Sequence, residues 1–530
     1  MTGMICRNFF FSLAVLLAGV GPALIGTEAA VAIDIVAVCP SEYRDGFQAW
    51  VDHREQDGLT VAVIENHPDA RSLLKSIQRS AAPQTRYVVL VGGSPAIGTT
   101  CDPTREIPTT YSPTTVTAKY GSTPTLSSDM PYGDFDQDGI PNAVVGRFPV
   151  NHKTELKNLI DRIIRYEQNS DFGLWRGDLQ LVGGIGGFGG MVDTAIETVT
   201  RTIVTGVLPA ETRTTVAYAS PNHRFFPKSK SFTEAVIENY NRGSRFWVYA
   251  GHGQVTQLDR VPASAEGRPV LDRDSVGQLN CAHAGSPIAL LLACYTGAID
   301  APESCFAERM LLADGGPVAV IAGSRVTMPY GNATAAIGLI DGVYHKKETR
   351  LGDAWLSTLV EMQRDAVTDR STPRMMVDSL AAMISPAGTN LVEERREHTR
   401  LYNLLGDPTL RLHPPQTIDL KVAPGYHAGE TITIESTSSI DGEITMTLDR
   451  PLGSPPVAAT SLGSSLHDDD DPNETSIASV TQQVTANQVN KSVFVLPLGI
   501  SGPLTIRALI AGEKTWATAA GRTIIHQHKH

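Results

Sequence analysis

Two apolar runs of the chain each end in a side chain that can do chemistry at a carbonyl carbon. Residues 246–253, FWVYAGHG, present His252 between two glycines, and residues 288–297, IALLLACYTG, present Cys294 before a glycine-containing turn. A thiol attacks only as a thiolate, so a cysteine hydrolase needs an imidazole that takes the thiol proton and later protonates the leaving amine. The pair therefore predicts a cysteine-dependent hydrolase.

Gly253 adds a backbone group to these two side chains. Because it has no Cβ, its N–H can come close to the carbonyl of a substrate. Together with the N–H of Cys294, it could form an oxyanion hole, in which two donors stabilise the negative charge of a tetrahedral intermediate.

The elements that must position these residues alternate between strands and helices. Hydrophobic periodicity predicts helices at 41–56, 71–79, 194–207 and 232–241, and strands at 33–38, 59–64, 87–93, 179–184, 214–220, 244–253, 287–297 and 317–324. This order is typical of an α/β fold with a doubly wound, mainly parallel sheet, whose active loops lie at the carboxyl ends of the strands. We therefore expect His252 and Cys294 at one edge of the sheet, facing each other across a cleft.

The pattern changes after His413, where helical periodicity gives way to short alternating runs. These runs predict an all-β, immunoglobulin-like sandwich over residues 414–530, with strands at 418–422, 430–436, 442–449, 491–498 and 503–511. For the acidic run from Asp468 to Asp471 we expect a solvated hairpin loop of this domain, and the alternative is a calcium role.

The first 32 residues have the pattern of a signal peptide. Arg7 supplies a positive charge, an apolar run follows, and Ala30-Val31-Ala32 has the small-x-small form of a cleavage site. No later stretch is long and apolar enough to cross a bilayer, so we expect an exported protein: extracellular, at the cell surface or in the periplasm. Cleavage leaves five cysteines, which allows two disulfides and still leaves one thiol unpaired.

Composition excludes several other classes of protein. The 530 residues are 42% hydrophobic and 19% charged, which is typical of a folded chain and neither disordered nor fibrous. Lys and Arg total 44 against 56 Asp and Glu, a formal charge of −12, and no basic cluster occurs. We therefore expect no nucleic-acid partner. The cysteine hydrolase chemistry predicted from His252 and Cys294 implies protein or peptide substrates instead, and it needs no cofactor for catalysis.

An acidic turn predicts a structural metal ion. Asp134, Asp136 and Asp138 precede Gly139 in a D-x-D-x-D-G pattern, in which alternate carboxylates can point at one calcium ion. Position twelve of this loop is Val145, so it is not a complete EF-hand. Asn142 could add a carbonyl ligand, and the alternative is an Asx-turn without metal.

The ordered set of motifs resembles the gingipain family of cysteine peptidases, which are related to caspases and legumain. The resemblance covers residues 33 to 412, and it rests on YAGHG (249–253), LLLACYTG (290–297), CFAERMLLADGGPVAVIAGSR (305–325), SDMPYGDFDQDGIPNAVVGRFPV (128–150) and LLGDPTL (404–410). It implies an N-terminal α/β subdomain at 33–170 with the acidic turn, a caspase-like catalytic subdomain at 171–413, and an immunoglobulin-like domain after them.

The same resemblance implies the roles of individual residues. Cys294 is then the nucleophile, and His252 is the general base and acid. Gingipains also have an acidic residue that orients the histidine, but GGIGGFGGMVD (183–193) contains no acid before Asp193. Three roles are open to Asp193: it could hold a basic side chain of the substrate next to the scissile bond, orient His252, or cap the helix that follows.

Together these features predict an exported cysteine endopeptidase that works through a thioester acyl-enzyme. One alternative is a surface-associated binding protein whose peptidase domain is weak or inactive. A second is a sortase-like transpeptidase of exported proteins, because an amine can compete with water for the same thioester.

Overall fold

The computed structural model describes residues 32–187, 189–281, 285–364, 372–386, 388–454 and 471–527. The described residues from Ile33 onward belong to one compact unit. The predicted signal peptide and most of the predicted acidic hairpin loop lie outside the described residues. No helix of the described segments combines the length and the apolar composition that a membrane span requires.

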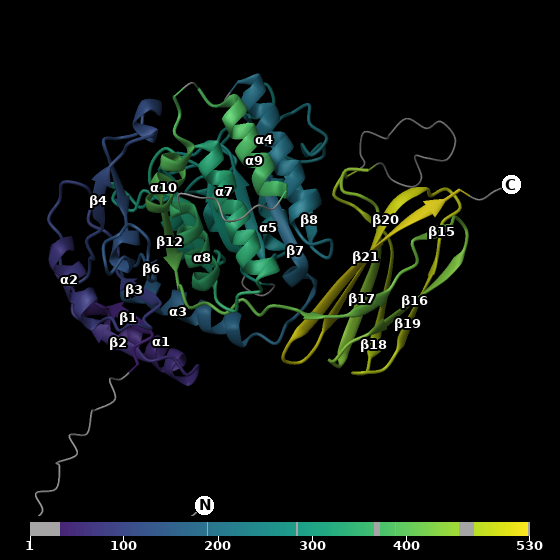
Figure 1. The fold of residues 1–530 in the computed structure, drawn as a ribbon, viewed down its shortest axis with the longest axis horizontal. Helices are drawn as coiled ribbons and strands as arrows, with labels where there is room; N and C mark the ends of the chain where they lie inside the picture. The colour runs from purple at the N-terminus through teal and green to yellow at the C-terminus, as the bar shows by residue number, and fades with distance from the viewer. Residues whose placement is uncertain are drawn as a thin grey trace, which may run out of the picture. The chain divides into compact units, whose positions relative to one another are not determined.

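A ten-stranded sheet forms the centre of the α/β part (Figure 1). Its strands follow in the order β2 (Val61–Ile64), β1 (Ile35–Val38), β3 (Tyr87–Val91), β6 (Val144–Phe148), β12 (Tyr402–Gly406), β11 (Ala319–Gly323), β10 (Ile288–Leu292), β9 (Phe246–Ala250), β7 (Asp178–Gly183) and β8 (Arg213–Tyr218). The mainly parallel α/β sheet predicted from the sequence is thus confirmed.

Only one pair of neighbours in this sheet, β11 and β12, is antiparallel. The other pairs are parallel, so the sheet consists of two parallel halves that run in opposite directions. The carboxyl ends of β7, β8, β9, β10 and β11 therefore share one edge. Because β12 pairs with both β6 and β11, one sheet continues through the predicted subdomains at 33–170 and 171–413.

Helices cover the sheet, which explains the apolar character of its central strands. Every residue of β10 (IALLL) and β11 (AVIAG) is buried, as expected for parallel strands packed on both faces. The helices are α1 (Arg44–Gln56), α2 (Ala70–Ser80), α3 (Lys153–Gln168), α4 (Gly190–Thr202), α5 (Phe232–Asn241), α6 (Phe306–Leu312), α7 (Pro329–Ile340), α8 (Leu351–Gln363), α9 (Thr372–Ile384) and α10 (Leu391–Leu401). Helix α7 packs against α8, α9 and α10, and α4 against α9.

The chain beyond His413 contains strands but no helix in its described residues. One sheet has β13 (Gln416–Thr417), β15 (Gly425–His427), β17 (Gly442–Asp449), β18 (Ser476–Val484), β20 (Gly502–Ala511) and β21 (Trp516–His526). A second has β14 (Asp419–Lys421), β16 (Thr431–Thr437) and β19 (Asn490–Val495). Apolar residues of both sheets share one core. The all-β prediction agrees with this, and an immunoglobulin-like topology stays a prediction.

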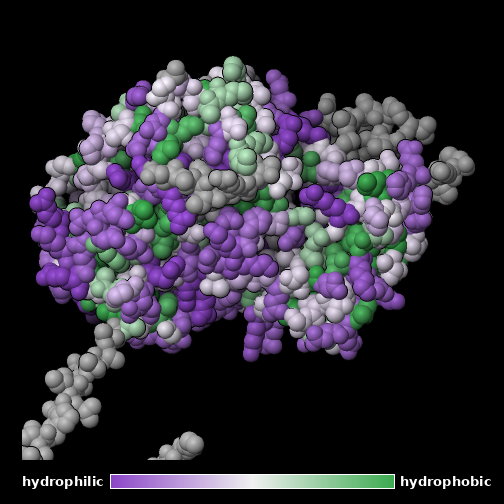
Figure 2. All heavy atoms as spheres, viewed as in Figure 1, coloured by the Kyte–Doolittle hydropathy of each residue, from purple (hydrophilic) through white to green (hydrophobic). Residues whose placement is uncertain are grey.

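The surface follows the usual distribution of polar and apolar side chains. On the face shown in Figure 2, hydrophilic residues predominate, and hydrophobic residues occur in small groups. Such small groups are normal for a folded chain, since polar atoms alone cannot cover its surface.

Candidate active site

Strands β9 and β10 bring His252 and Cys294 to the same edge of the sheet. The two strands are parallel neighbours, and their last residues, Ala250 and Leu292, are register partners. His252 and Cys294 each lie two positions beyond these partners, so both leave the sheet at the same level. The structure thus brings together the two residues that the sequence pairs.

The loop that carries His252 packs directly against the backbone of Cys294. A Cβ added to Gly253 would lie 2.7 Å from the carbonyl oxygen of Cys294 and 2.7 Å from Cγ2 of Thr296. Both distances are shorter than real Cβ contacts, so only glycine fits without displacing the cysteine loop. This close approach explains why a glycine follows His252.

The imidazole of His252 has a backbone carbonyl as its partner. Its Nε2 lies 3.0 Å from the carbonyl oxygen of Gly186, in the glycine-rich loop that follows β7. A carbonyl only accepts hydrogen bonds, so Nε2 carries the proton, and the acceptor lone pair of the neutral ring is on Nδ1. This tautomer suits a base that takes a proton at Nδ1.

Asp193 holds the same glycine-rich loop. It lies in the first turn of α4, and its two carboxylate oxygens accept the N–H of Gly187 at 3.1 and 3.2 Å. The N-cap residue of α4 is Gly189, so Asp193 is not the N-cap that one alternative from the sequence requires. Its contact with Gly187 places it one residue from the carbonyl that holds His252.

Cys294 differs from the other four described cysteines in its exposure. All five are free thiols, but Cys39, Cys101, Cys281 and Cys305 are buried, whereas Cys294 is partly exposed. Burial raises the pKa of Cys39 to about 12 and those of Cys101 and Cys281 to about 11, and it raises that of Cys305 well above its usual value. Thiols of this kind are unreactive at neutral pH.

The turn after Cys294 has an uncommon backbone conformation. Tyr295 has a φ of 57°, in the left-handed region that few non-glycine residues adopt. Its N–H donates to the carbonyl of Arg325 at 3.0 Å, and its hydroxyl accepts the N–H of Thr123 at 3.2 Å. Arg325 itself forms a buried ion pair with Asp300 at 2.6 Å. These contacts fix the conformation that turns Cys294 out of the sheet.

A cavity of about 430 Å³ opens beside Cys294. Its walls come mainly from apolar residues of α4, α7 and α9, and they include two carboxyl groups, those of Asp193 and Glu394. Burial raises the pKa of Glu394 to about 7, and this carboxyl accepts the N–H of Gly331 at 3.1 Å. The cavity has the size and the mixed lining of a site for a substrate side chain.

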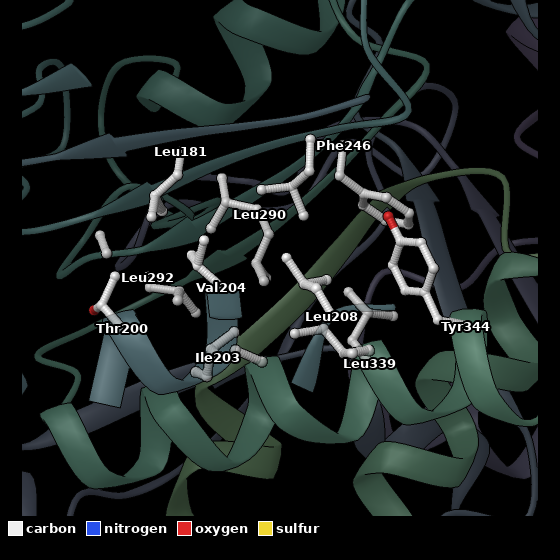
Figure 3. A pocket seen from close by; sticks show the side chains of 15 residues that line it. Leu181, Thr200, Ile203, Val204, Leu208, Phe246, Leu290, Leu292, Leu339 and Tyr344 are labelled. Atoms are coloured by element: carbon white, nitrogen blue, oxygen red, sulfur yellow. The ribbon is translucent and has the colours of Figure 1, made fainter. Parts of the chain in front are cut away.

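A smaller apolar cavity, of about 80 Å³, lies between the sheet and the helices (Figure 3). Leu181, Phe246 and Leu290 line it from the strands, and Leu339 and Tyr344 line it from the opposite side. It lies where α7 and the 203–208 segment pack on the sheet, and its lining includes the hydroxyl-bearing side chains of Thr200 and Tyr344.

The three carboxylates of the acidic turn are clustered as a cation site requires. One oxygen each of Asp134, Asp136 and Asp138 lie within 4.8 Å of one another. Asp134 Oδ2 accepts the N–H of Gly139 at 3.0 Å, whereas its buried Oδ1 has no hydrogen-bond partner among the described residues. Burial and the neighbouring carboxylates raise the pKa of Asp134. These residues fit a hard cation, which would pair the orphaned oxygen and neutralise the cluster.

Asn142 is engaged within the same turn. Its Oδ1 accepts the N–H of Phe135 at 2.6 Å, which closes the turn around the three aspartates. This hydrogen bond gives Asn142 a structural role that does not depend on a metal.

Comparison with known proteins identifies the family of the chain. The family model described as "Peptidase family C25" matches residues 28–413, which is most of the chain. The protein therefore belongs to peptidase family C25.

Curated relatives agree with this assignment. Gingipain R2 of Porphyromonas gingivalis is 25% identical over 304 residues, which are 54% of this chain and 36% of that relative. Gingipain R1 of the same organism is also 25% identical over 304 residues, which are 26% of its length. The chain thus spans about a third of the length of the first of these relatives, or less.

Solved structures show the same fold. The Arg-specific cysteine proteinase gingipain R matches with a TM-score of 0.53 and 18% identity, and the match covers 93% of this chain and 98% of that one. A complex of the pro- and mature domains of a Porphyromonas gingivalis proteinase matches with a TM-score of 0.51. At such low identity the likeness establishes the gingipain fold alone, in agreement with the sequence-based expectation.

Sequence reasoning missed several residues around the sulfur of Cys294. Thr327, in the loop after β11, contacts Sγ, and Gly186, Glu394 and His398 lie in or beside the same site. The loop that contains Thr327 follows the strand predicted at 317–324, so its position at the same sheet edge as Cys294 could have been inferred. Helix α10, which carries Glu394 and His398, lacked such a signal.

Proposed function

We propose that this protein is an exported cysteine endopeptidase in which Cys294 is the nucleophile and His252 the general base and acid. The main support is the environment of Cys294, which is the partly exposed thiol among the described cysteines. It lies against the loop that contains Gly253, and it lines a cavity. Membership of peptidase family C25 supports the reaction class. Export rests on the signal-like sequence of the first 32 residues.

The reaction follows from this arrangement in two halves. His252 takes the proton of the Cys294 thiol, and the thiolate attacks the carbonyl carbon of the scissile peptide to form a tetrahedral intermediate. The imidazolium then protonates the amine, which leaves as the C–N bond breaks and a thioester remains. Water, deprotonated by His252, attacks the thioester, releases the acid product and restores the thiol.

The carbonyl of Gly186 takes the place of an acidic partner for His252 in this proposal. It accepts a hydrogen bond from the Nε2–H in both the neutral and the protonated states of the imidazole, so it fixes the ring throughout the cycle. Asp193 supports it through Gly187 and lines the substrate cavity as well. Asp193 could therefore bind a basic side chain of the substrate next to the scissile bond, and substrate profiling should test this role.

Gly253 is assigned to the oxyanion hole, and its replacement gives a sharp test. Because a Cβ would meet the carbonyl of Cys294, we expect Gly253→Ala to lower kcat by about 100-fold, the typical effect of losing one oxyanion donor. Measured kcat and KM should show that the loss falls on kcat. Gly277→Ala is a suitable control, since its Cβ would enter open space. An unchanged kcat in Gly253→Ala would contradict the assignment.

The acidic turn is proposed as a structural calcium site. Asp134, Asp136 and Asp138 would supply the ligands, and the ion would stabilise the turn that precedes β6. We expect a chelator to lower the melting temperature of the wild-type protein by several degrees and calcium to restore it. Asp136→Asn should weaken this response. A melting temperature that is the same with chelator and with calcium would contradict the proposal.

Hydrolysis of a mixed peptide library by the wild-type protein and by Cys294→Ala tests the proposed function. Adding an amine acceptor separates hydrolysis from transpeptidation, since only the latter joins the amine to the acyl group. A wild-type protein that cleaves and joins no peptide would favour the binding-protein alternative instead.

A further inference from the structure

The loop between β11 and α7 brings Thr327 into contact with the sulfur of Cys294. The backbone N–H of Thr327 donates to Sγ at 3.3 Å, and its Oγ1 lies 3.9 Å from the same atom. The S–H group can in turn donate to the carbonyl of Thr327 at 3.7 Å. One residue therefore offers an acceptor to the thiol and two donors to the thiolate.

Asn332 and Tyr402 determine where the hydroxyl of Thr327 points. Nδ2 of Asn332, in the first turn of α7, donates to Oγ1 of Thr327 at 3.2 Å. The hydroxyl of the buried Tyr402, on β12, donates to Oδ1 of Asn332 at 2.7 Å, which fixes the amide orientation. Because Oγ1 accepts from Asn332, its own proton is available to Sγ.

The backbone of this loop is held by a second buried contact. The N–H of Met328 donates to Nε2 of His398 at 2.8 Å, and Nδ1 of His398 donates to the carbonyl of Glu394 at 2.6 Å. Burial lowers the pKa of His398 to about 4, so its ring stays neutral and keeps this acceptor at neutral pH. The donors of Thr327 are thus preorganised before any substrate binds.

The titratable groups around the sulfur include Tyr249 from β9 and Tyr402 from β12, which both interact with the charge of Cys294. The carboxyls of Asp193 and Glu394 line the same cavity as Cys294, and His252 lies in the loop after the neighbouring strand β9. Burial raises the pKa of both tyrosines well above its usual value. The charge of Asp259 adds to this effect for Tyr249, and the charge of Cys294 adds to it for both tyrosines. Both tyrosines are therefore neutral at pH 7. The N–H and the O–H of Thr327 are then fixed donors that can stabilise a negative charge on Sγ, in addition to the proton that His252 takes from the thiol.

We propose that Thr327 stabilises the thiolate of Cys294 through its N–H and its O–H, and that Asn332 and Tyr402 are positioning residues that direct the hydroxyl at the sulfur. This inference rests on the proposed role of Cys294 as a reactive thiol. It concerns thiol reactivity, however, and can be measured without any peptide substrate.

The test is the rate at which iodoacetamide alkylates Cys294, measured as a function of pH. The thiolate displaces iodide and forms a C–S bond, so the rate reports the thiolate fraction. For Thr327→Val we expect a rate about tenfold lower at pH 7, with the half-maximal pH about one unit higher and the plateau at high pH unchanged. Thr327→Ser, which keeps the hydroxyl, should restore the wild-type profile.

Two further variants complete this experiment. Asn332→Asp replaces the amide donor by a carboxylate and should shift the profile at least as far as Thr327→Val. Thr334→Val is the matched control. Thr334 lies on α7, as Asn332 does, but its hydroxyl donates to the carbonyl of Gly331 and not to Thr327. It should leave the profile unchanged.

A profile of Thr327→Val identical to the wild type, or of Thr327→Ser identical to Thr327→Val, would overturn the inference. So would a lower plateau together with a lower melting temperature, because that result indicates a purely structural role. The inference and the proposed function fail separately. If the variants show the predicted alkylation profiles but the wild-type protein cleaves no peptide, only the proposed peptidase function is refuted. If the wild-type protein cleaves peptides but Thr327→Val leaves the alkylation profile unchanged, only the inference about Thr327 is refuted.

Discussion

Replacing Cys294 by alanine is expected to lower kcat/KM for peptide hydrolysis by about 10⁴-fold or more. The substitution removes the only atom in the proposed site that forms a covalent bond to the substrate, and residual binding and oxyanion stabilisation cannot supply a nucleophile. Fold stability should change little, because the side chain is partly exposed and alanine fits the same strand end. Steady-state kinetics on a cleaved peptide, together with a melting temperature, measure both effects.

Cys101→Ser is the matched control for this variant. Cys101 is buried, and its Sγ bonds to the carbonyl of Glu106, away from Cys294. Its replacement removes a thiol but not the proposed nucleophile, so activity should be retained. If Cys294→Ala cleaved peptides as fast as the wild type, the assignment of the nucleophile would be wrong.

The second large effect is expected from His252→Gln, which should lower kcat by about 10³-fold at neutral pH. A glutamine side chain can still bond to Gly186 but cannot take the thiol proton, so the contribution of general acid–base catalysis is lost. The loss should be smaller at high pH, where solvent hydroxide can deprotonate the thiol. Single-turnover rates across the pH range measure this directly.

His345→Gln provides a comparison of the same chemical kind. Nε2 of His345 also bonds to a backbone carbonyl, that of Val207, at 3.1 Å, but this histidine lies in the segment after α7 and not in a loop that follows β9 or β10. Its variant should keep a kcat close to that of the wild type. Equal losses in His252→Gln and His345→Gln would indicate a general effect on the fold and would remove the case for His252 as the base.

Sequence patterns predicted the strands that carry the chemistry because these strands are apolar throughout. The runs that became β3, β9, β10 and β11 bury nearly every residue, and this is the pattern that hydrophobic periodicity detects best. The shared edge of β9 and β10 followed from their parallel order. The position of His252 beside Cys294 was therefore within reach of the sequence.

The parts of the site that come from β12, α10 and the loop after β7 could not be predicted from the sequence. Strand β12 pairs antiparallel with β11 and parallel with β6, and hydrophobic periodicity does not reveal such a pairing. The contact of Tyr402 with Asn332 could therefore not be inferred from the sequence. Helix α10, with His398, follows a stretch of helices that hydrophobic periodicity does not reveal. Likewise, the role of Gly186 is carried by a backbone carbonyl, and no side-chain pattern marks such a group.

The acidic turn also has one feature that the sequence predicts and others that only the structure shows. Alternate aspartates predicted clustered carboxylates, and the structure clusters them. The buried Oδ1 of Asp134 without a partner could be recognised only in three dimensions, as could the engagement of Asn142 with Phe135.

The proposed mechanism requires that Cys294 forms the covalent bond to the substrate. An acyl-enzyme can be trapped by mixing the wild-type protein with an activated peptide ester, quenching in acid and mapping the adduct by mass spectrometry of proteolytic fragments. We expect one acyl adduct, on the fragment containing Cys294, that is lost in Cys294→Ala and forms slowly in His252→Gln. Turnover of the ester without an adduct on Cys294, or an adduct on another residue, would contradict it.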